Sequence, residues 1–187
     1  MSEISDDQIL SLLAQEATYE KGFRYLMQKY QERLYWHIRR MVYEHEDAND
    51  VIQNTFIKVY RSIHKFQQNS KLYTWLYRIA TNESITYINR KKKKVTSSID
   101  DEEYAIAERL SADPYFDGDE VQIRLQQAIH TLPDKQRLVF QMRYFDEMSY
   151  KDISAVLDTS VGALKASYHH AVKKVEQFFR EGGSETT

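Results

Sequence analysis

The sequence contains no cysteine and little proline or glycine. Its 187 residues include two Pro and five Gly. The lack of Cys excludes disulfides and thiolate zinc sites, and the scarcity of helix-breaking residues favours long helices over hairpin-rich sheets. No apolar run approaches the roughly 20 residues that a membrane span requires, and the N-terminal MSEISDDQIL is acidic, unlike a signal peptide. We therefore expect a cytoplasmic protein without membrane insertion.

Charge is distributed unevenly along the chain. The net charge is −2, but residues 1–94 hold 16 Lys and Arg against 11 Asp and Glu, residues 95–120 hold 1 against 9, and residues 121–187 hold 9 against 8. The acidic segment also contains Pro114 and Gly118, which are typical of loops. This pattern predicts two domains joined by a flexible acidic linker, whose composition is also that of a solvated, disordered tether.

Two helices are predicted before the linker, separated by the loop KFQQNSK. In DANDVIQNTFIKVYRSIHKF the apolar residues recur every three or four positions, as on one face of a helix, and Asp47 stands where an N-cap residue would. This face consists of Ala48, Val51, Ile52, Thr55, Phe56, Val59 and Ile63. The second helix is predicted from about Thr74 to Lys92. Its expected core contacts are Trp75, Leu76, Ile79, Ala80, Ile85 and Ile88.

The region after the linker has the pattern of a helix-turn-helix. VQIRLQQAIHTL predicts one helix, and Pro133 fits the first turn of the next, where a missing N–H costs nothing. The apolar positions of that second helix are Leu138, Val139, Met142 and Phe145. Ser149 is then expected to cap the short helix YKDISAVL, and a tight turn at Asp158–Ser160 leads into a final helix over 159–175. A short helix, a brief turn and a longer helix form a common DNA-binding unit.

The final helix has two dissimilar faces at about 100° per residue. The residues predicted to pack against YKDISAVL are Val161, Leu164, Tyr168, Val172 and Val175. The residues predicted to face outward are Ala163, Ala166, Ser167, His170, Lys173 and Lys174, with Lys165 and His169 on the flank. Small side chains allow close approach to base edges, and lysines can contact phosphates. The pattern alone leaves open whether this face reads DNA or packs against another subunit.

No arrangement of residues predicts a metal site, a cofactor or catalysis. His169 and His170 are adjacent and project about 100° apart, unlike the i, i+4 pair of a helical metal site. The sequence has no H-E-x-x-H motif and no Gly-rich phosphate loop. His45, Glu46 and Asp47 stand at a predicted helix start, where capping explains them better than a metal. An enzyme, such as a nuclease, therefore has no candidate residues here.

Three blocks of the sequence, taken in order, resemble the extracytoplasmic-function (ECF) class of bacterial RNA polymerase sigma factors. They are DANDVIQNTF, TWLYRIATN followed by RKKKK, and LPDKQRLVFQMRYFDEMSYKDISAVLDTSVGALKA. The resemblance covers nearly the whole chain. It implies an all-α protein with sigma domain two at 1–94, a linker at 95–120, sigma domain four at 121–180 and a tail at 181–187. It also implies a non-catalytic transcription initiation factor that binds core RNA polymerase and directs it to promoters.

The resemblance further implies which residues contact the polymerase. It also implies the path that the linker takes. Asp50, Gln53 and Asn54 would bind the beta-prime coiled coil of core polymerase, although the family usually has Glu at the position of Asn54. The beta flap and an anti-sigma factor are the other protein partners implied. The acidic linker would follow the path of template and nascent RNA, where its charge would mimic nucleic acid.

The resemblance also implies two sets of promoter contacts. Residues expected to open and read the minus-ten element are Lys71, Tyr73, Trp75, Asn82, Arg90 and Lys91. Residues expected to read the minus-thirty-five element are Ala163, Lys165, Ala166, Ser167, His170, Lys173 and Lys174. Trp75 is also a candidate core residue, and Thr86 replaces an aspartate common in the family. The final helix lacks the arginines usual in the family, so its DNA binding should depend only weakly on salt.

A second hypothesis is a stand-alone regulator. It would bind duplex DNA through residues 149–175 and dimerise through its N-terminal helices. This hypothesis predicts tight, sequence-specific binding without polymerase, whereas a sigma factor of this size should bind promoter DNA poorly by itself.

Overall fold

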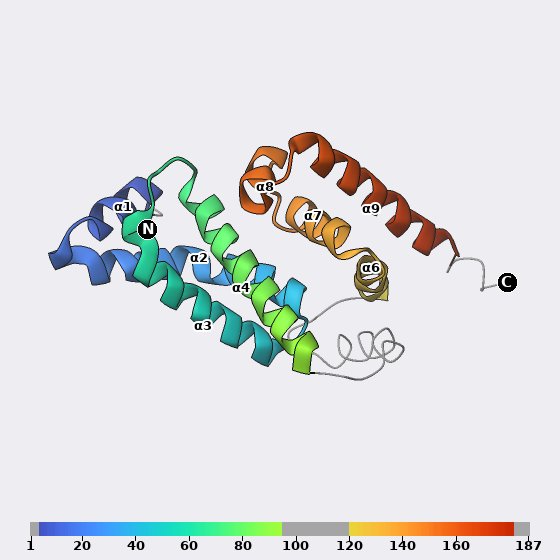
Figure 1. The fold of residues 1–187 in the computed structure, drawn as a ribbon, viewed down its shortest axis with the longest axis horizontal. Helices are drawn as coiled ribbons and strands as arrows, with labels where there is room; N and C mark the ends of the chain where they lie inside the picture. The colour runs from blue at the N-terminus through green and yellow to red at the C-terminus, as the bar shows by residue number, and fades with distance from the viewer. Residues whose placement is uncertain (1–3, 95–119, 182–187) are drawn as a thin grey trace. The chain divides into compact units, whose positions relative to one another are not determined.

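The computed structural model describes residues 4–94 and 120–181, and within these ranges every regular element is a helix. The chain divides into two compact units (Figure 1). Nearly all of the predicted acidic linker and the predicted tail lie outside the described residues. The all-α, two-unit architecture expected from the helical spacing is confirmed.

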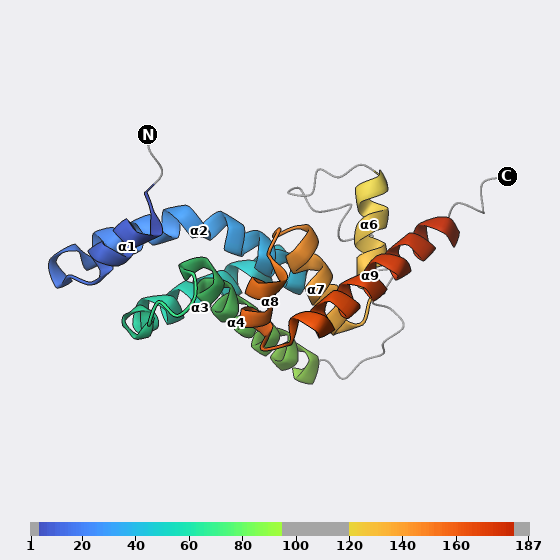
Figure 2. The same cartoon turned by 90° about the horizontal axis from the view of Figure 1, so that it is seen from above.

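The first unit is built on three long helices. Its elements are α1 (Asp6–Leu13), η1 (Glu16–Thr18), α2 (Tyr19–Val42), α3 (His45–Ser62), η2 (Ile63–Lys65) and α4 (Leu72–Lys94). α2, α3 and α4 pack against one another, and α1 packs on α2. α3 and α4 lie side by side in both views (Figure 1, Figure 2).

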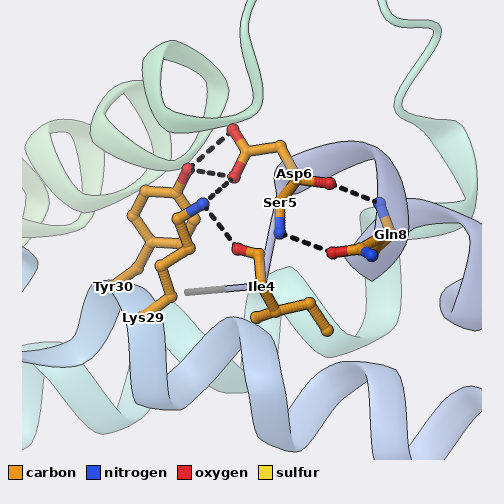
Figure 3. Close-up of polar contacts among 6 residues, drawn as sticks. All are labelled: Ile4, Ser5, Asp6, Gln8, Lys29 and Tyr30. Atoms are coloured by element: carbon orange, nitrogen blue, oxygen red, sulfur yellow. Dashed lines mark hydrogen bonds and ion pairs between the residues drawn. The ribbon is translucent and has the colours of Figure 1, made fainter. Parts of the chain in front are cut away.

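Helix α1 is fixed to α2 by polar contacts at its N-terminus (Figure 3). Ser5 and Gln8 form a capping box, in which the Gln8 N–H donates to Ser5 Oγ at 3.2 Å and the Ser5 N–H donates to Gln8 Oε1 at 2.9 Å. On α2, Lys29 forms an ion pair with Asp6 at 2.8 Å, and the Tyr30 hydroxyl donates to the same carboxylate at 2.7 Å. The Asp6 carboxylate therefore joins the two helices.

Gly22 allows α1 and α2 to approach closely. A Cβ at this position would lie 2.9 Å from Leu12 Cβ and 2.9 Å from the Leu13 backbone nitrogen. Real Cβ atoms do not come this close to backbone, so a side chain here would push the helices apart. Ile9 on α1 is fully buried.

Helix α3 has the predicted apolar face but not the predicted cap. All seven residues expected on that face are buried. The helix begins at His45 with Glu44 in the N-cap position, so the prediction that Asp47 caps it is wrong. His45 and Asp47 make tertiary contacts instead, and the His45 ring nitrogens lie 2.7 Å from the Tyr35 hydroxyl and 3.0 Å from the Asn49 amide.

Helix α4 extends two residues beyond its predicted range at each end. Leu76 and Ala80 are buried as expected, but Ile85 is 39% exposed, which contradicts its predicted core role. The buried face also contains residues that the apolar pattern missed, namely Thr74, Tyr77, Thr81 and Ser84. The polar members of this face form internal hydrogen bonds, as between Thr81 Oγ and His37 Nε2 at 2.9 Å. Because Ile85 directly follows Ser84, it projects about 100° away from the core.

The second unit contains α6 (Glu120–His130), α7 (Asp134–Tyr144), the first part of α8 (Tyr150–Leu157) and α9 (Val161–Glu181). One buried cluster of this unit consists of Ala128, Ile129, Leu132, Phe140, Ala171 and Val175. Other buried apolar residues are Val139, Met142, Met148, Ile153, Val156 and Leu164. α9 packs mainly on α7 and α6, so the prediction that its apolar arc packs on α8 is wrong for most of the arc. Tyr168 does contact α8, since its ring lies 6.3 Å from that of Tyr150. The packing arc is correspondingly rotated, because Ala171 is fully buried whereas Val161 is 38% exposed.

The turns of the second unit follow the predicted chemistry with one change. Pro133 is the N-cap of α7 instead of a residue of its first turn. Ser149 caps α8, since its Oγ accepts from the Asp152 N–H at 3.1 Å. The predicted turn before α9 is present, with Asp158 at φ 51°. Ser160 Oγ then accepts from the Ala163 N–H at 3.3 Å, and α8, the turn and α9 form the expected helix-turn-helix.

Candidate functional site

The three residues expected to bind polymerase lie together on the outer face of α3. Asp50, Gln53 and Asn54 are all exposed, while Val51 and Thr55 between and beside them are buried. Positions three and four apart are neighbours on a helix surface. The amphipathic pattern of α3 therefore gathers one carboxylate and two amides into a single patch.

An apolar groove between α2 and α3 borders this patch. It is lined by Phe23, Met27, Gln31, Ile52, Gln53, Phe56, Ile57, Tyr60 and Arg61. Ile57 is 49% exposed and Tyr60 is 40% exposed, so the groove carries apolar surface that the unit itself does not cover. The sequence reasoning missed this groove, although the i, i+4 spacing of Phe23, Met27 and Gln31 on α2 was the signal for it.

Tyr60, which lines the groove, belongs to a hydrogen-bonded cluster. The Tyr60 hydroxyl donates to Glu20 Oε1 at 2.6 Å, and the Tyr19 hydroxyl donates to the Tyr60 carbonyl at 2.6 Å. The bond to Glu20 raises the pKa of Tyr60, so this phenol stays neutral. The Tyr60 ring packs edge-on against Phe23 with centroids 4.9 Å apart. These contacts hold the aromatic groove wall in place.

Aromatic and basic side chains gather where the loop after η2 enters α4. The Lys71 ammonium lies 5.5 Å from the centroid of the Tyr73 ring, a cation–π arrangement. Trp75 is half-buried, and its ring lies 5.4 Å from that of Phe66 in the loop. Trp75 thus both packs inward and keeps an accessible edge. Exposed aromatic faces beside cations can stack unpaired bases and hold their backbone.

The six minus-ten candidates do not lie on one side of α4. At about 100° per residue, Trp75 projects within about 20° of Asn82, whereas Tyr73 and Lys91 project about 180° from it. Arg90 lies on the flank, with its guanidinium 5.3 Å from the Tyr87 ring. The exposed side around Asn82 also contains Arg78 from the block TWLYRIATN and Lys93 from the run RKKKK, together with Ile85, Thr86 and Asn89.

The opposite side of α4 faces α3 through a row of polar contacts. The Tyr87 hydroxyl and the Lys91 ammonium both donate to the Asp47 carboxylate, each at 2.5 Å. One turn earlier, Glu83 forms an ion pair with Lys58. The hydrogen bond to Asp47 is the main cause that raises the pKa of Tyr87 to about 12. We call Asp47, Tyr87, Lys91, Glu83 and Lys58 the α3–α4 seam.

The outward face of α9 carries the predicted minus-thirty-five residues. Exposed members are Ala163, Lys165, Ala166, His170, Lys173 and Lys174, and Ser167 is half-buried. The Lys165 ammonium lies 5.9 Å from the centroid of the Tyr150 ring on α8. The start of this face has the small residues Ala163, Ala166 and Ser167 with Lys165 on the flank, and Lys173 and Lys174 make its end cationic. Small side chains suit close approach to a groove.

Neither metal binding nor membrane insertion has a structural candidate in the described ranges. In residues 4–94 and 120–181 no group of three or more His, Asp or Glu side chains is arranged to hold a metal ion. In the same ranges no helix is long and apolar enough to cross a membrane.

Comparison with known proteins identifies both units. The family profile described as Sigma-70 region 2 matches residues 26–94, and that described as Sigma-70, region 4 matches residues 122–175. The chain is 30% identical to the RNA polymerase sigma-H factor of Pseudomonas aeruginosa, over 84% of this chain and 86% of that protein. It is also 30% identical to the ECF RNA polymerase sigma-E factor of Escherichia coli K12, over 94% of this chain and 95% of that protein.

Two helical units with these matches define a bacterial transcription initiation factor. The chain belongs to the sigma-70 family, in its ECF class. It is a promoter-directing subunit of RNA polymerase, as the resemblance of the three sequence blocks predicted, and a stand-alone regulator is not favoured.

Solved structures have the same fold. A sigma factor RpoE in complex with the anti-sigma factor NepR, from Bartonella quintana, aligns with a TM-score of 0.69 at 18% identity, over 86% of this chain and 98% of that chain. CnrH in complex with the cytosolic domain of CnrY aligns with a TM-score of 0.67 at 21% identity, over 92% of this chain and 97% of that chain. At such identities the likeness concerns the fold.

Proposed function

We propose that this sigma factor acts as a non-catalytic, cytoplasmic initiation factor whose first unit binds core polymerase and opens the minus-ten element, while its second unit reads the minus-thirty-five element. The boundaries we propose are 1–94 and 121–180, joined by the acidic segment. The observation that carries the proposal is the match of region 2 and region 4, in that order, to the two helical units.

The beta-prime coiled coil of core polymerase is the proposed partner of the α3 patch. Asp50, Gln53 and Asn54 are exposed within about one helical turn. Gln53 also lines the apolar groove between α2 and α3. A polar patch beside uncovered apolar surface supports docking of a protein helix, since the apolar part contributes affinity and the polar part sets orientation. The beta flap is the proposed partner of the second unit.

The minus-ten element is proposed to meet the start and the Asn82 side of α4. Lys71, Tyr73 and Trp75 combine one cation with two half-buried aromatic rings, which suits an unstacked base. Asn82 can hydrogen-bond a base edge, and Arg90 can contact the strand backbone. Thr86 stands one turn after Asn82 and donates its hydroxyl proton to the Asn82 carbonyl at 2.8 Å, so toward a base it could only accept a hydrogen bond.

The minus-thirty-five element is proposed to meet the outward face of α9. Ala163, Ala166 and Ser167 would lie near base edges, and the lysines near phosphates. His170 is exposed on the same face and replaces an arginine usual in the family. With fewer fixed charges, this contact should release fewer counterions than is typical of the family.

An anti-sigma factor is the proposed regulator. Both solved relatives described above are recorded with a second protein, named as an anti-sigma factor in one case and as CnrY in the other. The uncovered groove between α2 and α3 supplies a surface for such a partner, in competition with polymerase.

Run-off transcription with cognate core polymerase and a promoter library tests the proposal. We expect promoter-specific transcripts only when this chain is present. Asp50→Lys should weaken core binding, whereas Glu16→Lys, the matched charge reversal on exposed η1, should leave it unchanged. Asn82→Ala should bind core normally and reduce promoter opening, measured by permanganate reactivity of unpaired thymines.

Two results would contradict the proposal. One is the absence of any promoter-specific transcript with cognate core. The other is tight, sequence-specific binding of the isolated chain to duplex DNA that polymerase does not change, which is the behaviour of a stand-alone regulator.

A further inference from the structure

We infer that contacts among Asp47, Tyr87 and Lys91 hold the basic end of α4 on α3. Lys91 therefore does not contact DNA, and Arg78 and Lys93 contact it instead. The inference rests on the proposed role of α4 at the minus-ten element. The inference concerns which basic side chains of α4 contact promoter phosphates.

The contacts of Lys91 direct it toward α3. Its ammonium donates to Asp47 Oδ2, while the Tyr87 hydroxyl donates to Oδ1 of the same carboxylate. The Asp47 side chain is 14% exposed and that of Lys91 is 51% exposed. Both oxygens of a mostly buried carboxylate are therefore occupied by donors from α4. A DNA phosphate would have to displace a charge-assisted hydrogen bond to recruit Lys91.

A second contact, the ion pair between Glu83 and Lys58, joins the same side of α4 to α3. Glu83, Tyr87 and Lys91 are spaced four residues apart, and each meets a polar group of α3. Residues at i, i+4 and i+8 share one face of a helix. The α3–α4 seam thus fixes the rotation of α4 about its own axis over two turns. Rotation decides which side chains can face a promoter.

The opposite side of α4 carries uncompensated cations. Lys93 projects within about 20° of Asn82 and Arg78 within about 40°. Both side chains are exposed, and neither forms an ion pair with any other side chain of the described residues. A cation without a nearby carboxylate can neutralise a phosphate at no electrostatic cost within the protein. Arg78 and Lys93 therefore join Arg90 as phosphate contacts of this helix, in place of Lys91.

Salt dependence separates a DNA contact from a structural role. Each phosphate neutralised contributes about 0.9 to the slope of log affinity against log salt for duplex DNA, and about 0.7 for single strands. Lys93→Ala and Arg78→Ala should each make the slope shallower by roughly that amount. Lys91→Met, which keeps the aliphatic stem, should leave the slope unchanged. A residue with only a structural role would not alter the slope.

The Asp47→Asn variant gives a result of opposite sign. It removes the carboxylate charge but keeps the shape, so Lys91 is released and the slope should become steeper by about one phosphate contact. The Asp47→Asn, Lys91→Met double variant should return to the wild-type slope. Loss of packing alone could weaken binding in both variants, but it would not produce a steeper slope that depends on Lys91.

The measurement uses holoenzyme reconstituted from core polymerase and the full chain. Promoter affinity is measured on a fork-junction DNA from roughly 50 to 200 mM salt, after core binding and thermal unfolding show that each variant is folded and assembled. The proposal is supported if the slope becomes shallower in Lys93→Ala and Arg78→Ala, is unchanged in Lys91→Met and becomes steeper in Asp47→Asn. An equal loss of slope in Lys91→Met and Lys93→Ala overturns it, as does an unchanged slope in Asp47→Asn. Failure of the wild-type holoenzyme to select promoter DNA instead overturns the proposed function.

Discussion

At the scale of single residues, two apolar side chains of the same helix, α4, differ greatly in their expected contribution to stability. Leu76 is fully buried, whereas Ile85 is 39% exposed between the polar residues Asn82 and Asn89. The hydrophobic contribution of a side chain scales with the apolar area removed from water, and a cavity adds to the loss only where neighbours surround the site.

Truncation of Ile85 should therefore cost little stability. We expect Ile85→Ala to lower the free energy of unfolding by less than about 1 kcal/mol, and Leu76→Ala to lower it by about 2 to 5 kcal/mol. Urea unfolding followed by circular dichroism measures both. Equal losses in the two variants would mean that Ile85 is part of the core after all.

At the scale of elements, the α3–α4 seam couples two helices through one carboxylate. Asp47 and Lys91 are 44 positions apart in the sequence, and Asp47 and Tyr87 are 40 apart. Hydrogen bonds to a charged acceptor are stronger than neutral ones, and they favour the protonated phenol. The hydrogen bond to Asp47 is the main reason that the pKa of Tyr87 is raised to about 12.

This contact predicts a pH dependence above neutrality. An unfolded tyrosine loses its proton near pH 10, whereas folded Tyr87 keeps it until about pH 12. The folded state then binds more protons than the unfolded state, so the stabilisation is complete below pH 10 and is lost as the pH rises toward 12. The difference in unfolding free energy between wild type and Tyr87→Phe should shrink over this interval. A difference that stays constant would exclude the hydrogen bond as its source.

At the scale of the whole molecule, each unit has a core of its own. The first unit buries residues from α1 to α4, and α6, α7, α8 and α9 also contribute buried residues. Self-contained cores are the property that allows domains to fold separately. We therefore expect the two units to be independent in stability.

A fragment of residues 1–94 should fold by itself. We expect its helical circular dichroism to match the sum expected for α1 to α4, with one cooperative urea transition. A shorter fragment that begins at residue 26, where the family match starts, should be less stable because it loses α1 and the contacts of Ile9 and Asp6. Gradual, non-cooperative unfolding of the longer fragment would contradict an independent domain.

Much of the fold was predictable because helices are encoded by local spacing. The buried face of α3, the cap at Ser149 and the turn at Asp158 all depend on residues within a few positions of one another. That the three residues of the proposed polymerase patch lie together, exposed on α3, was predictable for the same reason, since they share one turn. The seam was not, because Asp47 resembles an N-cap in sequence and its real partners are distant.

The sequence by itself determined the all-α class, the division into two units and the family, because periodicity and the order of motifs are properties of the chain. Only the tertiary structure decided which side of α4 faces α3, that α9 packs on α6 and α7, and that Lys91 is paired while Lys93 is exposed with no ion pair to the described residues. The physical reason is that a helix presents its residues in all directions. Which direction is buried depends on neighbours that local spacing does not specify.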